Sequence, residues 1–141
     1  MQKQIMGYVV GAFDLFHVGH VNILRNAKSM CDYLTVGLST DEWVKNYKNK
    51  TVIIPFSQRK EILMSCKFVD SVAPQEDFED FKMWEKINFD VMFVGDDWKN
   101  SERFKNLEEK FKKVNVKIIY LPYTKEISTS MIKNKINMDL K

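Results

Sequence analysis

The chain has 141 residues, 45% of them hydrophobic and 29% charged, which is ordinary for one globular domain, and we expect a single domain over residues 1–141. Its formal net charge of +3 is too small to indicate a nucleic acid partner. No apolar run approaches the roughly 20 residues of a transmembrane helix, and the amino terminus lacks the apolar core of a signal peptide. We therefore expect a cytoplasmic protein with no membrane partner. Cys31 and Cys66 are isolated in the sequence, which disfavours a disulfide framework or a structural zinc site.

The first half of the chain alternates between strand-like and helix-like segments. An apolar run predicts a strand over residues 5–10, and helical spacing predicts a helix over 21–28. A second strand follows at 33–38, then a helix or turn start at 39–42 and a polar, lysine-rich loop at 46–51. Ser57 is expected to cap a helix over 57–64. Residues 69–72 form a short strand candidate, which Pro74 is expected to close.

The alternation continues to the end of the chain. The sequence predicts a helix over 78–87, a central strand over 91–94, a helix carrying apolar residues from Phe104 to Val114, and a strand over 116–121. Ser128 is expected to open a last helix with Ile132 and Ile136 on its buried face. Strands separated by helices of this length form right-handed crossovers. The predicted fold is therefore α/β, a Rossmann-like open parallel sheet with helices on both faces.

Polar or glycine-containing segments follow three of the predicted strands. They are Gly11 to His20, Gly95 to Trp98, and Tyr123 to Thr129. Ligands of open parallel sheets bind beyond the carboxyl ends of the strands. The three segments are therefore expected to meet in one site.

The only two histidines of the chain, His17 and His20, stand at the start of a predicted helix with Gly19 between them. Imidazoles at a helix N-terminus can donate hydrogen bonds to a phosphate, and the helix dipole assists. A glycine between them leaves room for a ligand to approach the backbone. A solvent-exposed pair and a metal site remain as alternatives, although a metal would need further ligands that are not histidine.

Other polar side chains near these strand ends have two interpretations each. Lys45, Lys48 and Lys50 form either a solvated charge run or a set of contacts to a polyphosphate. Ser128 and its neighbours cap a helix, and the same hydroxyls and N–H groups can bind phosphate oxygens. The two aspartates after the central strand either shape a turn or contact a ribose or a metal.

Residues 11–20, GAFDLFHVGH, resemble the G-x-F-D-x-x-H-x-G-H motif of the cytidylyltransferase branch of the HxGH nucleotidylyltransferases. The segments at 39–42, 95–98 and 127–130 resemble further motifs of that branch in the same order. The resemblance extends over the whole chain and is greatest to the small, single-domain members that act on glycerol 3-phosphate. It implies that an acceptor phosphate attacks the α-phosphorus of CTP in line, which releases pyrophosphate and gives a CDP-alcohol. Mg²⁺ is expected to accompany CTP, with no dedicated protein metal site.

The resemblance also implies roles for residues of this sequence. His17 and His20 would hold the α-phosphate, and Lys48 and Lys50 would join them as catalytic residues. The acceptor would be bound by Arg59, Asp70 and Phe78. The nucleotide would be bound by Gly11, Ala12, Phe13, Asp14, Gly19, Asp96, Tyr123, Thr124, Ile127, Ser128 and Thr129.

Several positions depart from the family pattern. Tyr123 replaces an arginine, with Lys125 nearby as a replacement charge, and Phe81 stands near the place of an acceptor-side lysine. The acceptor therefore stays open: glycerol 3-phosphate, phosphoethanolamine or a sugar phosphate. ATP or GTP in place of CTP, and a CTP-binding module without turnover, are the remaining alternatives. Members of the family are commonly homodimers, and we expect the same here.

Overall fold

The structure, a computed structural model, describes residues 3–140. The strands are β1 (Met6–Gly11), β2 (Tyr33–Ser39), β3 (Ser71–Gln75), β4 (Val91–Gly95) and β5 (Lys117–Leu121). The helices are α1 (Val18–Lys28), α2 (Asp41–Tyr47), α3 (Phe56–Met64), α4 (Asp80–Ile87), the 3-10 turn η1 (Asp96–Trp98), α5 (Glu102–Lys112) and α6 (Thr129–Asp139).

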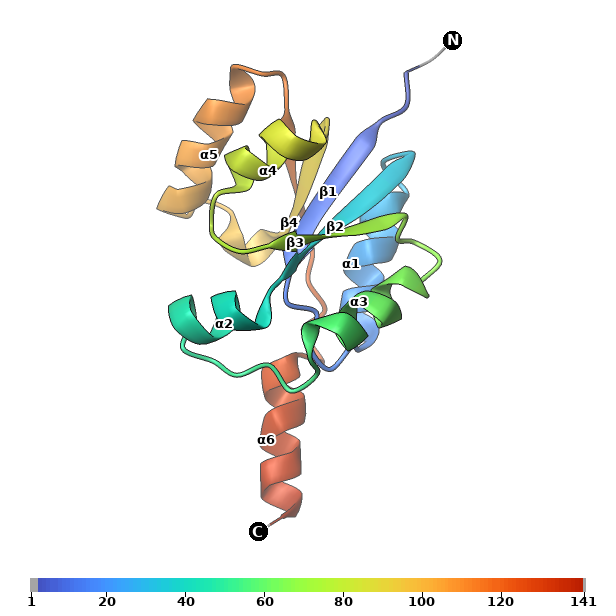
Figure 1. The fold of residues 1–141 in the computed structure, drawn as a ribbon, viewed down its shortest axis with the longest axis vertical. Helices are drawn as coiled ribbons and strands as arrows, with labels where there is room; N and C mark the ends of the chain where they lie inside the picture. The colour runs from blue at the N-terminus through green and yellow to red at the C-terminus, as the bar shows by residue number, and fades with distance from the viewer. Residues whose placement is uncertain (1–2, 141) are drawn as a thin grey trace.

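All five strands are parallel, in the order β3-β2-β1-β4-β5 (Figure 1). Strands β2 and β3 are added in turn on one side of β1, and β4 and β5 are added on its other side. The order therefore reverses between β1 and β4, and a reversal of this kind leaves a crevice at the carboxyl ends of the two strands. The predicted α/β fold with an open parallel sheet is confirmed.

Two apolar cores cover the two faces of the sheet. One unites Val9 and Leu34 of the sheet with Leu24 of α1 and Leu63 of α3. The other contains Tyr8, with side chains of α4 and α5 packed over it. Figure 1 shows α1 and α3 on one side of the sheet and α4 and α5 on the other. Because side chains alternate along a strand, neighbouring residues such as Tyr8 and Val9 enter opposite cores.

Some element boundaries differ from those expected. Pro74 lies within β3, paired in register with Leu38, and does not end the strand. A proline is tolerated there because β3 is an edge strand, whose outer side needs no N–H donor. Helix α3 begins at Phe56 with Pro55 as its N-cap residue, two positions before the cap predicted at Ser57.

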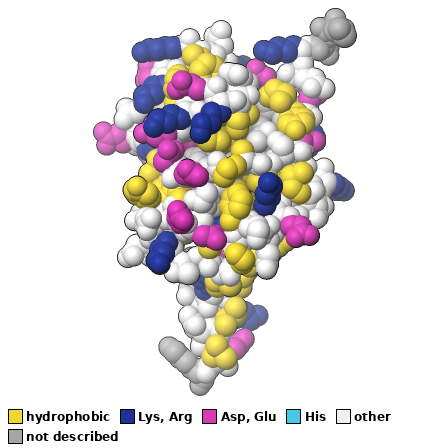
Figure 2. Space-filling model, viewed as in Figure 1, with side chains coloured by type: hydrophobic (Ala, Val, Ile, Leu, Met, Phe, Trp, Pro, Cys, Tyr) yellow, Lys and Arg dark blue, Asp and Glu magenta, His cyan; other side chains and the backbone are white. Residues whose placement is uncertain are grey.

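Helix α6 extends away from the body of the protein along its long axis (Figure 1). The expected buried face is wrong: no residue of α6 is buried, and Ile136 is 48% exposed. Figure 2 shows this helix as a narrow extension that carries hydrophobic side chains at its surface. Within residues 3–140, none of the helices combines the length and the apolar character that crossing a membrane requires.

Candidate active site

A cavity of about 360 Å³ opens where the sheet order reverses. Strand β1 pairs with β2 as far as Gly11, but it pairs with β4 only as far as Val9 opposite Phe93. Strands β1 and β4 therefore separate at their carboxyl ends. The cavity is lined there by residues of β1, by Gly95 of β4, by the start of α1 and by the segment that leads into α6.

The two histidines form the N-cap of α1. His17 is the N-cap residue, and its Nδ1 accepts a hydrogen bond from the backbone N–H of Gly19 at 3.0 Å. His20 reaches back, and its Nδ1 accepts from the backbone N–H of His17 at 3.2 Å. The two rings stack with their centroids 3.8 Å apart. This is a reciprocal capping box in which imidazoles take the places usually held by Ser or Thr and Glu.

The capping bonds determine the tautomer of both rings. A nitrogen that accepts a hydrogen bond carries no proton, so each neutral ring must carry its proton on Nε2. Burial lowers the pKa of His17, while burial and then the neighbouring His17 lower the pKa of His20 to about 4. Near neutral pH the site therefore presents two neutral imidazoles, and within residues 3–140 neither Nε2–H group has an acceptor, so both can donate to a ligand. Both rings line the cavity.

Gly19 is required by the imidazole of His17. A Cβ atom on Gly19 would lie 2.8 Å from Cε1 and 2.9 Å from Nδ1 of His17. Distances this short are not tolerated, so any larger residue would displace the ring from its capping position. The structure adds this reason to the expected one: Gly19 also lines the cavity, and close approach of a ligand to its backbone stays a prediction.

Asp14 organises the loop and does not line the cavity. Its carboxylate accepts hydrogen bonds from the backbone N–H groups of Ile53 at 2.7 Å and Ile54 at 3.0 Å, and also from Leu15. The residues on either side, Phe13 and Leu15, have left-handed backbones with φ of 49° and 50°. Such strain persists where surrounding bonds hold it, and it concentrates at functional sites. Asp14 thus connects the end of the lysine-containing loop to the turn after β1. Its carboxylate has this structural role, whereas the resemblance had assigned Asp14 to nucleotide binding.

Most of the other residues assigned to the nucleotide do line the cavity. They are Gly11, Ala12, Phe13, Gly19, Tyr123, Thr124, Ile127, Ser128 and Thr129. Ser128 caps α6 as predicted, accepting from the N–H of Met131 at 3.1 Å. Asp96 is exposed and does not line the cavity, whereas its neighbour Asp97 does.

A smaller cavity of about 170 Å³ adjoins the first. Gly11, Gly95 and Trp98 line both cavities. Lys48 and Phe78 line the smaller one, so the structure brings one lysine of the predicted pair to the site, while Lys50 is exposed and lies outside both linings. Burial lowers the pKa of Lys48, and the positive charges of Arg103 and Lys50 add to the effect.

Arg59 is buried and fully engaged within the protein. Its side chain is 0% exposed and forms an ion pair with Asp41. The same guanidinium donates to the carbonyl oxygens of Ile54, Ala12 and Ser39 at 2.7 to 2.9 Å. It lines neither of the two cavities. The acceptor role expected for Arg59 is therefore replaced by a structural one: it connects the ends of β1 and β2 to α3.

Asp70 lies at the amino-terminal end of the strands, opposite the end at which the cavities open. It immediately precedes β3, accepts from the N–H of Leu34 at 2.8 Å, and forms an ion pair with Lys28 at 2.6 Å. In a parallel sheet the residues before a strand are a full strand length away from its carboxyl end. The expectation that Asp70 binds the acceptor is therefore wrong on position alone.

Arg103 is a charged residue of this site that was not predicted from the sequence. It lies in the first turn of α5 and lines the smaller cavity. The sequence contained one indication: a cation in the first turn of a helix opposes the helix dipole, where acidic residues are favoured. Nothing local indicated which cavity it would border.

Comparison with known proteins identifies the family of this chain. The family model described as cytidylyltransferase-like matches residues 8–135. The glycerol-3-phosphate cytidylyltransferase of Bacillus subtilis is 38% identical over 136 residues, which cover 95% of this chain and 97% of the relative. An FAD synthase of Thermococcus onnurineus is 35% identical, covering 86% and 82%.

Among solved structures, the lipopolysaccharide core biosynthesis protein of Thermoplasma volcanium superposes with a TM-score of 0.76 at 26% identity, covering 86% of this chain and 99% of that chain. The family model spans nearly the whole chain, and a relative of almost equal length exceeds one third identity. The chain therefore belongs to the cytidylyltransferase-like family and is a nucleotidyltransferase.

Proposed function

We propose that this enzyme transfers CMP from CTP to a small phosphorylated alcohol such as glycerol 3-phosphate, giving a CDP-alcohol and pyrophosphate. The observation that carries the proposal is the pair of Nε2–H donors on His17 and His20, held at the N-terminus of α1 beside the larger cavity. Neutral donors in fixed positions, assisted by the helix dipole, suit a phosphate on which negative charge develops.

The reaction needs no protein nucleophile and no strong base. A phosphate monoester is largely ionised at neutral pH because its second pKa is about 6. Its oxygen attacks the α-phosphorus of CTP as the bond to the leaving pyrophosphate breaks, and the electron pair of that bond leaves with the pyrophosphate. The protein then contributes mainly orientation and charge stabilisation.

The remaining cavity residues divide between the two substrates. Ser128 and Thr129, at the N-terminus of α6, are suited to the triphosphate because N–H groups at a helix start bind anions. Lys48 lines the adjoining cavity and adds a positive charge between the substrates. We propose that CTP enters as its Mg²⁺ complex, with Asp97 as the carboxylate available on the cavity wall.

The size of the second cavity favours a small acceptor. At about 170 Å³ it lies well below the roughly 300 to 1,000 Å³ typical of sites for drug-sized ligands. A flavin-sized acceptor, of the kind that the name FAD synthase implies, fits this space less well than a three-carbon phosphate.

Pyrophosphate release tests the proposal directly. Purified enzyme is incubated with each of CTP, ATP and GTP and with glycerol 3-phosphate, phosphoethanolamine, a sugar phosphate or FMN. We expect pyrophosphate release only when CTP is combined with a small phosphomonoester, and none with ATP, GTP or FMN. Binding of CTP with no release in the presence of any acceptor would instead indicate a module without turnover.

Histidine variants test the mechanism. We expect His17→Ala and His20→Ala to lower kcat by at least about 100-fold, the usual loss for one donor to developing charge. Lys67→Gln, which removes an exposed charge far from the site, serves as the control and should leave kcat unchanged. A loss below about tenfold, or about 1.4 kcal/mol of barrier, would contradict the assigned role.

The homodimer is also a proposal. Exposed apolar side chains of α6, including Met131, Ile136 and Met138, would be covered by a second copy. Sedimentation equilibrium of the full chain distinguishes the dimer from a monomer.

A further inference from the structure

We propose that Arg103 binds the phosphate of the acceptor, and that Tyr8, Gln75 and Asp80 hold its guanidinium in place. The inference rests on the proposed function and names a residue of the same site. It is carried by three features: the position of Arg103 at the smaller cavity, the buried side chains beneath it, and the charges around it.

Arg103 lies at the cavity with most of its hydrogen-bonding capacity unused. Its side chain is 31% exposed, and its Cζ atom lies 4.4 Å from the ring centroid of Phe78. Stacking on an aromatic ring fixes the plane of a guanidinium, whose five N–H donors form a rigid fork. Among residues 3–140 the group makes a single hydrogen bond, from Nη2 to Asp80 at 2.9 Å. The remaining donors are available to a planar or tetrahedral oxyanion.

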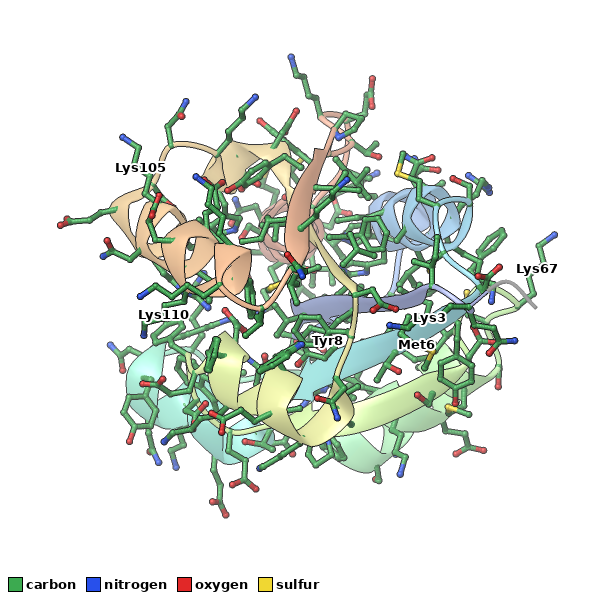
Figure 3. All side chains as sticks on the ribbon, turned by 90° about the horizontal axis from the view of Figure 1, so that it is seen from above. Lys3, Met6, Tyr8, Lys67, Lys105 and Lys110 are labelled. Atoms are coloured by element: carbon green, nitrogen blue, oxygen red, sulfur yellow. The ribbon has the colours of Figure 1, made fainter. Side chains whose placement is uncertain are left out.

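A chain of buried polar side chains supports that single bond. The carboxylate of Asp80, 1% exposed, accepts from Nε2 of Gln75 at 2.8 Å on its other oxygen. Gln75 in turn accepts from the hydroxyl of Tyr8, which is fully buried. The chain runs from β1 through the end of β3 to the start of α4, and Figure 3 shows Tyr8 in the interior between the sheet and the helices that cover it.

A buried series of polar side chains of this kind adds little net stability to a fold. Buried ion pairs repay little more than their desolvation, and apolar residues of equal volume commonly serve as well or better. A second requirement shows that the chain is specifically accommodated. A Cβ atom on Gly37 would lie 1.8 Å from the hydroxyl oxygen of Tyr8, so a glycine must occupy the middle of β2 for the hydroxyl to fit. In the proposal this polar chain has a second role, which is to hold the guanidinium of Arg103, at which it ends, beside the cavity.

The positive charges that line the smaller cavity favour an anionic ligand. Lys48 and Arg103 both line it, and their mutual repulsion contributes to the lowered pKa of Lys48. Asp77 is the acidic residue in the lining, and its carboxylate already accepts from the N–H of Glu79 at 2.8 Å. A phosphate dianion between Lys48 and Arg103 would relieve the repulsion and satisfy the free donors of the fork.

Steady-state kinetics of pyrophosphate release test the proposal. We expect Arg103→Gln to raise the KM for the acceptor by about 10- to 100-fold, the effect of losing a charge-assisted bidentate contact. The KM for CTP should stay within threefold. Arg103→Lys should lie between wild type and Arg103→Gln, because lysine restores the charge without the fork. Lys105→Gln is the matched control: it removes a cation from the same helix at a residue that points into solvent (Figure 3), and it should change neither KM.

Asp80→Asn tests the supporting chain. It preserves the shape of the side chain but removes the anchoring charge, so we expect a smaller rise in the acceptor KM, about threefold to tenfold, at nearly unchanged kcat. A purely structural role predicts a lower Tm with unchanged KM values.

The outcomes separate the two proposals. An acceptor KM within threefold of wild type in Arg103→Gln, or an equal rise in the KM for CTP, overturns the role of Arg103 while the proposed function stands. If Arg103→Gln does not fold, the same criterion applies to Arg103→Lys. If wild-type enzyme releases no pyrophosphate with any acceptor, the proposed function fails, and the role of Arg103 fails with it.

Discussion

Replacing Gly37 by alanine tests the packing on which the polar chain depends. The new Cβ would lie 1.8 Å from the hydroxyl oxygen and 2.4 Å from Cζ of Tyr8, whereas contacts below 3.0 Å essentially do not occur. The tyrosine ring must therefore retreat by more than an ångström. It has no free space to do so, because it is fully buried and stacked on Phe89 with the ring centroids 4.6 Å apart.

The cost has two parts. Overpacking a buried position costs about 1–3 kcal/mol. Displacement of the hydroxyl also breaks its bond to Gln75 and leaves buried polar atoms unpaired, for about 1–3 kcal/mol more. We expect Gly37→Ala to lower the free energy of unfolding by about 3 kcal/mol, which corresponds to a fall in Tm of about 10 °C for a chain of this length.

Urea denaturation of four proteins measures the effect: wild type, Gly37→Ala, Tyr8→Leu and the double variant. Leucine removes both clashing atoms of Tyr8 and leaves Oε1 of Gln75, 2.9 Å from the new Cβ at the end of a flexible side chain, so the alanine methyl group occupies largely vacated space in the double variant. We expect a coupling free energy of about 2 kcal/mol between the two positions, with unchanged m-values as the internal control. Additivity within about 0.5 kcal/mol, or a stable Gly37→Ala protein, would refute the reasoning.

Three further changes have distinct expected results. Gly19→Ala should abolish most turnover by displacing His17 while changing Tm little, because a lost cap and a gained helix former nearly cancel at about 1 kcal/mol each; a fall in Tm with full activity would contradict this. The unfolding free energy should fall as the pH drops from about 6.5 toward about 4, because the unfolded chain gains a proton that folded His20 does not, with a slope of at most about 1.4 kcal/mol per unit. His20→Asn, which does not titrate, should flatten that dependence in pH-dependent urea melts, and an unchanged slope would exclude His20 as the source. Arg59→Met should lower the free energy of unfolding by about 3–5 kcal/mol in urea melts, because it removes the buried donor of three carbonyl groups at about 1–3 kcal/mol each, whereas a role limited to the acceptor would leave stability unchanged.

Features with a local signature were predictable. Apolar runs and helical spacing identified the strands and helices to within a few residues, since each pattern reflects which side of an element is buried. The site at the strand ends followed from one rule of parallel sheets. The placement of both histidines at a helix start was also local, and the structure added the capping geometry that defines their tautomers.

Residues assigned by resemblance alone were less secure. Arg59 and Asp14 occupy motif positions, yet both are engaged by backbone groups far away in the sequence. Asp96 and Asp97 are adjacent and chemically identical, and only the path of the chain after β4 decides which of them borders the cavity. Asp70 lies before the first residue of β3, so the length of that strand separates it from the site at the carboxyl ends.

The sequence by itself determined the alternation of elements, the end of the sheet at which the candidate site opens, and the position of the two histidines at a helix start, all of which depend on residues close together in the chain. Tertiary structure alone decided that Arg103 from α5 meets Asp80 of α4 and, through Gln75, the interior of the sheet. It also decided that α6 extends from the body with its apolar residues exposed. These contacts arise from how separate elements pack against one another, and no periodicity or cap within one element encodes them.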